Sequence, residues 1–322
     1  MSADAYKLRL DRPLDREVAR LFRSQVNRAR RALKKPDDDS VHTARKALKR
    51  ARAVLRLVRG ALAQDDFDRL DDAVRQLGRR LGPVRDAAVA DSLVDGLAEE
   101  KALKPSVIRA LRAELDARHA AAWIDLTADD GIEAIRTELA DLRLDRDALA
   151  GIDALALHGG FAWTYRRGGE RLSRAVERRR AHDLHAWRRQ VKHLGYQLRV
   201  LTPIWPLVLG PTARAFDRLA EALGDDHDLD ELARIAAASG LGKNEARAVA
   251  RLARKRREAL QSAIWPLGAR CYAESPGAFA GRVTLYLAAA LAEAHGAPIH
   301  PLDGVALPSP PNRLFAPVPT AA

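Results

Sequence analysis

The chain has 322 residues, of which 47% are hydrophobic and only 5% aromatic, so its core must rest mostly on Ala, Leu and Val, as in packed helices rather than sheets. Lys and Arg outnumber Asp and Glu by 55 to 43, which indicates an anionic partner, although a solvated surface with a basic bias would give the same balance. The single cysteine, Cys271, excludes an internal disulfide framework and a multi-cysteine metal site, and it fits a reducing compartment.

The N-terminal segment carries charges where a signal peptide needs an apolar stretch, and no later segment is long and apolar enough to span a bilayer. We therefore expect a cytoplasmic protein with no membrane partner. The first predicted helix covers residues 14–34, behind Pro13, and Ser40 is predicted to cap the second helix. Strand signals are almost absent, so the expected fold is all-α.

Helical spacing of apolar residues continues along most of the chain. Further helices are predicted at residues 40–60, 65–81, 86–100, 106–123, 131–142, 155–180, 184–202, 212–223, 228–239, 244–263 and 276–295. Beyond Gly296 the chain is rich in proline, and we expect residues 297–322 to form a disordered or loosely attached tail.

The pattern of the first half of the chain starts again in the second half. The segment Val41–Lys49 aligns without a gap with Leu184–Lys192. A second block, Leu81–Asp86, aligns with Leu223–Asp228 at nearly the same offset. Two blocks in the same order predict an internal repeat, with one helical bundle in residues 1–150 and another in residues 151–296.

Each repeat contains one helix with a stripe of cations. Their spacing of three and four residues places them on one side of the helix, about a third of a turn from an apolar stripe. The first stripe consists of His42, Arg45, Lys49, Arg52, Arg56 and Arg59, with Lys46 beside it. The second consists of His185, Arg188, Lys192 and Arg199, with Arg189 and Tyr196 beside it. Like charges at this spacing destabilise a helix, and no Glu interrupts either stripe, so the stripes favour an anion site over a merely soluble surface.

The helix before each stripe supplies weaker candidates for the same site. These are Arg20 and Arg23 in the first copy, and Arg167, Arg171 and Arg174 in the second. The histidines that open the stripes, His42 and His185, are candidate anion ligands, acid–base groups or structural residues. Neighbouring cations disfavour imidazolium, so each should be neutral when free and able to gain a proton when an anion arrives.

The sequence resembles the CHAD domain family over about residues 10–296, in its two His-x-x-Arg-(Lys/Arg)-x-x-Lys helices and two Leu-Gly-x-x-(Arg/His)-Asp turns. This resemblance implies two pseudo-symmetric helical bundles with a basic groove between them, inorganic polyphosphate as the ligand, and association with polyphosphate granules. It also implies that the groove is lined by His42, Arg45, Lys46, Lys49, Arg52 and Arg56 from the first copy, and by His185, Arg188, Arg189, Lys192, Tyr196 and Arg199 from the second. Two positions depart from the family pattern: Ala88 replaces the acid that Asp230 keeps in the second copy, and Gly195 leaves a gap in the second stripe.

Two other functions fit parts of the sequence. The acidic run 225–231 suggests a metal-dependent phosphohydrolase, but the first copy has Arg85-Asp86 there, and arginine is no ordinary metal ligand. A basic groove would also attract nucleic acid, but single-strand binders use aromatic platforms, which are few here. We expect a non-catalytic protein without a cofactor or metal.

A structural role shared by both copies explains the two Leu-Gly blocks more simply than metal catalysis does. In that interpretation Gly82 and Gly224 each end a helix, and Asp86 and Asp228 each cap the next one.

Overall fold

The structure, a computed structural model, describes residues 6–297, which contain helices and no β-strand. The predicted tail, apart from Ala297, lies outside the described residues. The helices of the first half are α1 (Leu14–Ala32), α2 (Asp38–Leu57), α3 (Gln64–Arg80), α4 (Gly82–Glu99), α5 (Pro105–Thr127) and α6 (Gly131–Asp141). Those of the second half are α7 (Ala154–Arg178), α8 (Ala181–Leu201), α9 (Pro206–Ala238), α10 (Lys243–Cys271) and α11 (Pro276–Ala294). The all-α prediction is confirmed.

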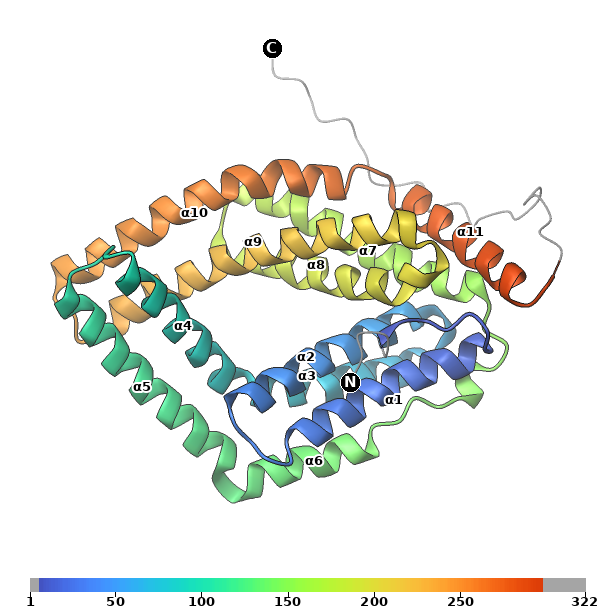
Figure 1. Cartoon of the computed structure of the whole chain (residues 1–322), viewed down its shortest axis with the longest axis horizontal. Coiled ribbons are helices and arrows are strands. Elements are labelled where there is room, and N and C mark those ends of the chain that lie inside the picture. The colour runs from blue at the N-terminus through green and yellow to red at the C-terminus, as the bar shows by residue number, and fades with distance from the viewer. Residues whose placement is uncertain (1–5, 298–322) are drawn as a thin grey trace, which may run out of the picture.

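The helices form two groups joined at one end of the molecule. In Figure 1, α1, α2, α3 and α6 make the lower group, and α7 to α11 make the upper one. Helices α4 and α5 leave the lower group and reach the far ends of α9 and α10. The two groups also meet where α2 packs against α7 and α8.

Helix α2 begins earlier than the sequence predicts. Asp37 is its N-cap: the Ser40 backbone N–H donates to the Asp37 carboxylate at 2.7 Å. The Asp37 N–H donates in turn to the Ser40 hydroxyl oxygen at 2.8 Å. Ser40 is therefore the third helical residue and the second half of a capping box, so its prediction as the cap is wrong.

A single long helix, α9, replaces the two helices predicted at residues 212–223 and 228–239. The first half does break at the corresponding place, because α3 ends at Arg80 and α4 begins at Gly82. Pro83 lies in the first turn of α4, and it has no N–H to continue the hydrogen bonds of α3. The second half has Asp225 in this place and stays helical.

The first Leu-Gly block spans the end of α3 and the start of α4, and the second lies inside α9. Gly82 opens α4 directly after the C-cap of α3, and Gly224 lies inside α9, while Asp86 and Asp228 follow one turn later in the same helices. The interpretation of Gly224 as a helix end and of Asp86 and Asp228 as caps is wrong. A glycine and an aspartate four residues apart instead share one face of a helix.

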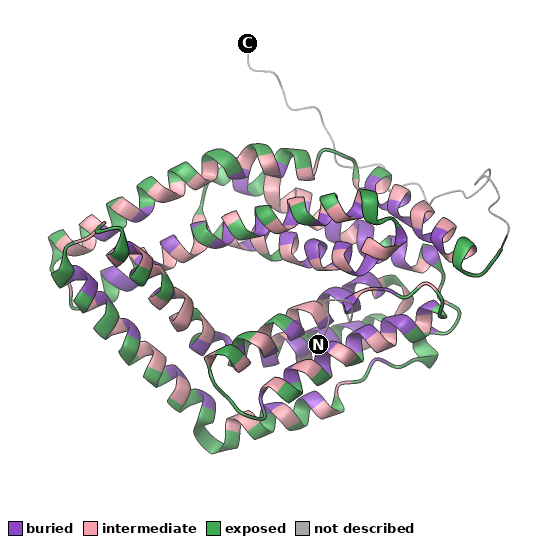
Figure 2. Cartoon of the chain, in the orientation of Figure 1, coloured by how far each residue is buried: buried purple, intermediate pink, exposed green. Residues whose placement is uncertain are grey.

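One hydrophobic core runs through both halves. It includes Phe22 from α1, Phe161 from α7 and Trp187 from α8, all nearly inaccessible to solvent. Figure 2 shows buried positions on the facing sides of the helices in both groups. A smaller core joins α4 and α5 to α9 and α10. The apolar contacts thus do not separate at residue 150, and the division into two bundles stays a prediction.

Candidate functional site

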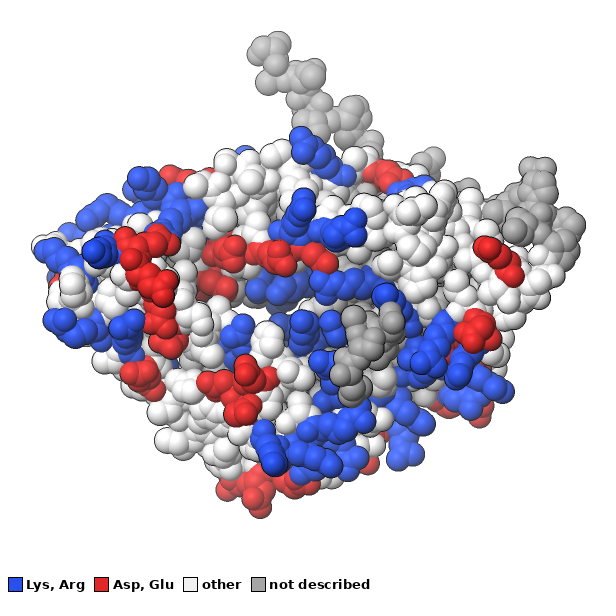
Figure 3. All heavy atoms as spheres, in the orientation of Figure 1, with Lys and Arg blue, Asp and Glu red and all other residues white. Residues whose placement is uncertain are grey.

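The charged stripes of α2 and α8 lie close to each other. Helix α2 packs against α8, and the charges of Arg45 and Lys49 act directly on those of Arg188 and Lys192. We call these four residues the central cluster. On the face shown in Figure 3 the surface is hollowed between the two groups of helices, and Lys and Arg gather along this hollow. Cations that are far apart in the sequence thus share one site.

The two lysines of the central cluster are unusually weak bases. Burial and the adjacent charges of Arg45 and Arg188 together lower the pKa of Lys49 to about 8. Burial, Arg188 and Lys49 lower the pKa of Lys192 to about 7. Among the described residues neither lysine has a carboxylate in ion-pair contact. Asp86 and Asp228 act on these lysines from nearby without pairing with them, so the cluster is a concentration of positive charge that the protein neutralises only in part.

Each Leu-Gly block accommodates one arginine of the central cluster. A Cβ at Gly82 would lie 3.0 Å from Nη1 of Arg45, and a Cβ at Gly224 would lie 3.2 Å from Nη2 of Arg188. The guanidinium groups thus occupy the space that any larger residue would fill. Asp86, one turn after Gly82, lies 3.4 Å from Nη2 of Arg45. Because glycine has no side chain, it leaves room for the guanidinium group of the arginine, which explains why both copies carry a glycine here.

Both arginines of the central cluster keep unused hydrogen-bond donors. Nε and Nη1 of Arg45 and Nε of Arg188 are buried, and they have no acceptor among the described residues. Buried donors are normally paired. Their position at the hollow indicates an acceptor that comes from a ligand.

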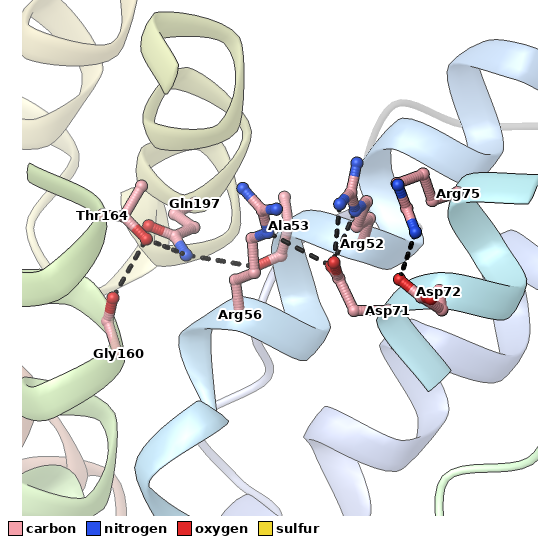
Figure 4. A network of polar contacts seen from close by, with 9 residues as sticks. All are labelled: Arg52, Ala53, Arg56, Asp71, Asp72, Arg75, Gly160, Thr164 and Gln197. Carbon is pink, nitrogen blue, oxygen red and sulfur yellow. Dashed lines mark hydrogen bonds and ion pairs between the residues drawn. The ribbon is translucent and has the colours of Figure 1, made fainter. Parts of the chain in front are cut away.

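Other members of the predicted stripes are paired with acids. Nε and Nη2 of Arg52 donate to the two carboxylate oxygens of Asp71, each at 2.6 Å, and Nε of Arg56 donates to the same group at 3.3 Å (Figure 4). Arg199 forms an ion pair of 2.6 Å with Asp217. These acids come from α3 and α9, so the spacing within α2 and α8 could not indicate them. The paired arginines contribute less free charge than the central cluster.

The gap at Gly195 also has a structural cause. A Cβ at this position would lie 3.3 Å from Oδ1 of Asp217, the carboxylate that pairs with Arg199. The second stripe thus has a closely packed α9 where the first has Arg52. The two stripes are not equivalent along their whole length.

Comparison with known proteins identifies the family of this chain. The sequence model of the CHAD domain family matches residues 16–237. The chain belongs to the CHAD domain family. PptA from Streptomyces chartreusis has a similar fold, with a TM-score of 0.56 and 16% identity over 82% of this chain and 100% of that one. The CHAD domain from the plant Ricinus communis is also similar, with a TM-score of 0.51 and 19% identity over 89% of this chain and 96% of that one. No curated protein matches the sequence.

The remaining stripe candidates border the central cluster of this CHAD domain. Lys46 is exposed, but the protein around it displaces part of its water, and this partial desolvation and the charges of Arg50 and Arg199 lower its pKa. Arg189 is also exposed, and partial desolvation and the charges of Arg171 and Arg52 lower its pKa. The Tyr196 ring meets that of Tyr6 edge to face and lies between two guanidinium groups, those of Arg50 and Arg199.

The weaker candidates of the preceding helices are dispersed. Arg20 donates to the buried Glu17 carboxylate at 2.6 Å and lines, with Arg23, a pocket on the outside of α1. Arg167 pairs with Glu170 at 3.0 Å. Arg171 lies near Arg189 of the second stripe. Arg174 is exposed, and it has no ion pair within residues 6–297.

The histidines agree with the expectation of neutral imidazoles. Burial and the charges of Arg85 and Lys46 lower the pKa of His42. The pKa of His185 falls to about 3 through burial and the neighbouring His227, whose ring centroid is 4.2 Å away. Burial and nearby arginines lower the pKa of His227 to about 4. His185 and His227 are therefore neutral near pH 7, and the pKa of His42 is shifted in the same direction.

Sequence reasoning missed two residues at the edge of the central cluster. Arg85 on α4 acts on the charges of Lys49 and Lys192. His227 on α9 holds the position in the second copy that corresponds to Arg85, and it lowers the pKa of His185. A signal was present, because both residues precede the aspartate of the Leu-Gly block.

Several carboxylates of the acidic run on α9 form ion pairs with arginines. Asp226 is buried and accepts hydrogen bonds from Nε of Arg257 at 3.1 Å and from Gln261 at 2.7 Å. Asp230 accepts from Nη1 of Arg257 at 2.6 Å. Within residues 6–297 no group of three His, Cys, Asp or Glu side chains is placed to hold a metal ion. Nor does any described helix combine the length and apolar character that a membrane crossing requires.

Proposed function

We propose that this CHAD domain binds inorganic polyphosphate, without catalysis, in a basic groove centred on the stripes of α2 and α8. The observation that carries the proposal is the central cluster, in which Arg45 and Lys49 from one half meet Arg188 and Lys192 from the other. Among the described residues its four cations form one ion pair, from Arg45 to the exposed Asp86, and buried donors of both arginines have no acceptor. Family membership supports polyphosphate as the ligand. Association with polyphosphate granules would follow from the same binding.

A linear polyanion suits the arrangement of the charges. Cations one turn apart on a helix are separated by about 5 Å along its axis, so successive phosphates of one chain can meet successive side chains. The unused donors of Arg45 and Arg188 would then pair with phosphate oxygens. Orthophosphate could satisfy only one such place at a time.

Nucleic acid is the weaker candidate, because the aromatic rings near the stripes are covered. Arg56, Arg59 and Arg167 lie over the Trp163 ring, with guanidinium carbons 4.6 to 5.9 Å from its centroid. Arginines flank Tyr196 in the same way. Proteins that bind single strands stack bases on exposed aromatic rings, whereas arginine side chains already lie over these rings.

Calorimetric titration tests the choice of ligand. Long-chain polyphosphate, tripolyphosphate, orthophosphate and single-stranded DNA are titrated into the protein at matched ionic strength. Long-chain polyphosphate should bind much more tightly than orthophosphate and more tightly than the DNA. Equal affinity for polyphosphate and orthophosphate, or a preference for DNA, would refute the proposal.

The non-catalytic part has a separate test. We expect phosphate release from polyphosphate to stay at background when Mg²⁺ or Mn²⁺ is present, because Arg257 already engages Asp226 and Asp230. Turnover that disappears in His227→Ala and Asp228→Asn would instead support the metal-dependent phosphohydrolase.

A further inference from the structure

A second basic site lies on the outside of α1. A pocket of about 450 Å³ is lined by Arg16, Arg20, Arg23 and Arg31 of α1, and by Arg143 and Arg146 of the segment that follows α6. Its volume falls within the range of small-molecule sites, roughly 300–1,000 Å³. Figure 3 shows Lys and Arg gathered over α1 on this face. No acidic residue lines the pocket.

Five of the six arginines of this pocket lack the acidic partners that elsewhere neutralise arginine; Arg20 is the exception. Glu17 holds Arg20 with bonds from Nε at 2.9 Å and from Nη2 at 2.6 Å. Within residues 6–297 the other five arginines form no ion pair or hydrogen bond through their side chains. Five free guanidinium groups around one pocket repel one another, and a surface that served only solubility would mix in acids. The lining therefore indicates an anionic ligand.

The pocket is separate from the central cluster. Positions 16, 20, 23, 27 and 31 repeat at helical spacing and lie on the side of α1 opposite the residues it buries against the core, such as Val18 and Phe22. Helix α2, which carries the first stripe, packs against α1. Helix α1 thus lies between the pocket and α2, and one small anion cannot occupy both sites.

We propose that this arginine pocket is a second anion site, which binds a short chain of linked phosphates, either free or carried by a nucleoside. Each guanidinium presents a planar pair of donors that matches the oxygens of one phosphate. Asn27 and Ser24 add neutral hydrogen-bonding groups to the lining, and Leu144 adds an apolar patch. The limited volume selects a ligand of a few phosphates over a long polymer. The site does not depend on the function proposed for the central cluster.

The test counts binding sites on the whole chain. Tripolyphosphate and ATP are titrated at low salt into the wild type, a pocket variant (Arg23→Gln with Arg143→Gln), and a cluster variant (Arg45→Ala with Lys49→Ala). Arg247→Gln with Arg251→Gln removes the same charge from exposed positions on α10 and serves as the control. Unfolding midpoints by circular dichroism confirm that each variant folds.

We expect the pocket variant to lose one set of tripolyphosphate sites, or to weaken it about tenfold or more, because charge-assisted hydrogen bonds are lost. The control should bind like the wild type. Arg23→Lys with Arg143→Lys keeps the charge and the fold, and it should bind with intermediate affinity. Tighter binding of ATP than of tripolyphosphate assigns the site to nucleotides, and the reverse assigns it to free phosphate chains. A pocket variant that matches the control in affinity and site number overturns the proposal. A cluster variant that matches the wild type refutes only the function proposed for the central cluster.

Discussion

At the centre of the site, Lys49 and Lys192 hold their protons weakly. Burial and neighbouring cations bring their pKa values to about 8 and about 7, below the ordinary value of 10.5. An anion beside them would restore the charged form, so binding should take up protons from solution. The unfolded chain binds more protons than the folded one between these pKa values and 10.5, so the two lysines make the ligand-free protein more stable as pH rises through that window.

The first prediction concerns this proton uptake. Polyphosphate affinity should fall as pH rises from about 7 to about 9, since protonating the lysines then costs more free energy. Calorimetry in buffers of different ionisation enthalpy measures the protons taken up. Lys49→Arg with Lys192→Arg, whose side chains stay charged, should abolish most of the uptake. Equal uptake in this variant would assign the protons to other groups, such as His42.

The second prediction concerns Gly224, which leaves room for the guanidinium group of Arg188. Gly224→Ala should displace the Arg188 guanidinium, because its Cβ would lie 3.2 Å from Nη2. Polyphosphate binding should weaken, while stability stays equal or rises by up to about 1 kcal/mol, since alanine favours helix more than glycine does. Gly96→Ala on α4, with no neighbour within 4 Å of the added carbon, is the matched control. Unchanged binding in Gly224→Ala would show that the space beside Gly224 has no role in the site.

At the scale of the helix, α2 combines two kinds of cation. Lys49 has no ion pair among the described residues and Arg45 has only the exposed Asp86, whereas Arg52 and Arg56 bind the buried Asp71 of α3. Removing the first kind relieves repulsion. Removing the second kind leaves a buried acid with fewer partners, which costs stability. One stripe thus contributes to binding at one end and to packing at the other.

The third prediction separates these roles. Arg45→Ala with Lys49→Ala should weaken polyphosphate binding and flatten the decline of log K with log salt, because fewer counterions are released. Arg188→Ala with Lys192→Ala should do the same. Both should melt at or above the wild-type temperature, whereas Arg52→Ala should melt lower. Unfolding of either double variant would make those residues structural, and wild-type binding at every salt concentration would place the groove elsewhere.

At the scale of the whole molecule, both halves contribute to one core and to one cluster of charge. Gln197 of α8 donates to the carbonyl of Ala53 on α2 at 3.2 Å. A Cβ at Gly160 of α7 would lie 2.2 Å from the carbonyl oxygen of Leu57, so only glycine allows α7 to pack this closely against α2. These contacts hold the two stripes at a constant separation. A chain of phosphates can therefore bridge preorganised cations without ordering the protein first.

The fourth prediction follows from that bridging. A long polyphosphate engages both stripes, so its affinity should depend on the two together, as in multivalent binding. Loss of the cations on one helix, α2 or α8, should lower affinity for long chains by a larger factor than for tripolyphosphate. Titrations of both double variants with ligands of graded length measure this. An equal factor at every length would mean that each stripe binds its own ligand.

Local patterns in the sequence determined much of this protein. The spacing of apolar residues determined the helices, and the alignment of residues 41–49 with 184–192 led to the two cationic helices and to the CHAD domain family. These features depend on residues within a few helical turns of one another, so they can be recognised in a short stretch of sequence. Helix ends were less accurate, as at Asp37, because capping depends on which of several polar side chains reaches the backbone.

Only the tertiary structure decided which cations are free. Asp71 and Asp217 neutralise stripe residues from helices that no spacing within α2 or α8 reveals. The same holds for the arginine pocket, where Arg143 lies beside arginines of α1 that are far from it in the sequence. Charge interactions act through space over a few ångströms and not along the sequence. The packing of the helices therefore sets the balance between paired and unpaired charge, on which the proposed anion binding depends.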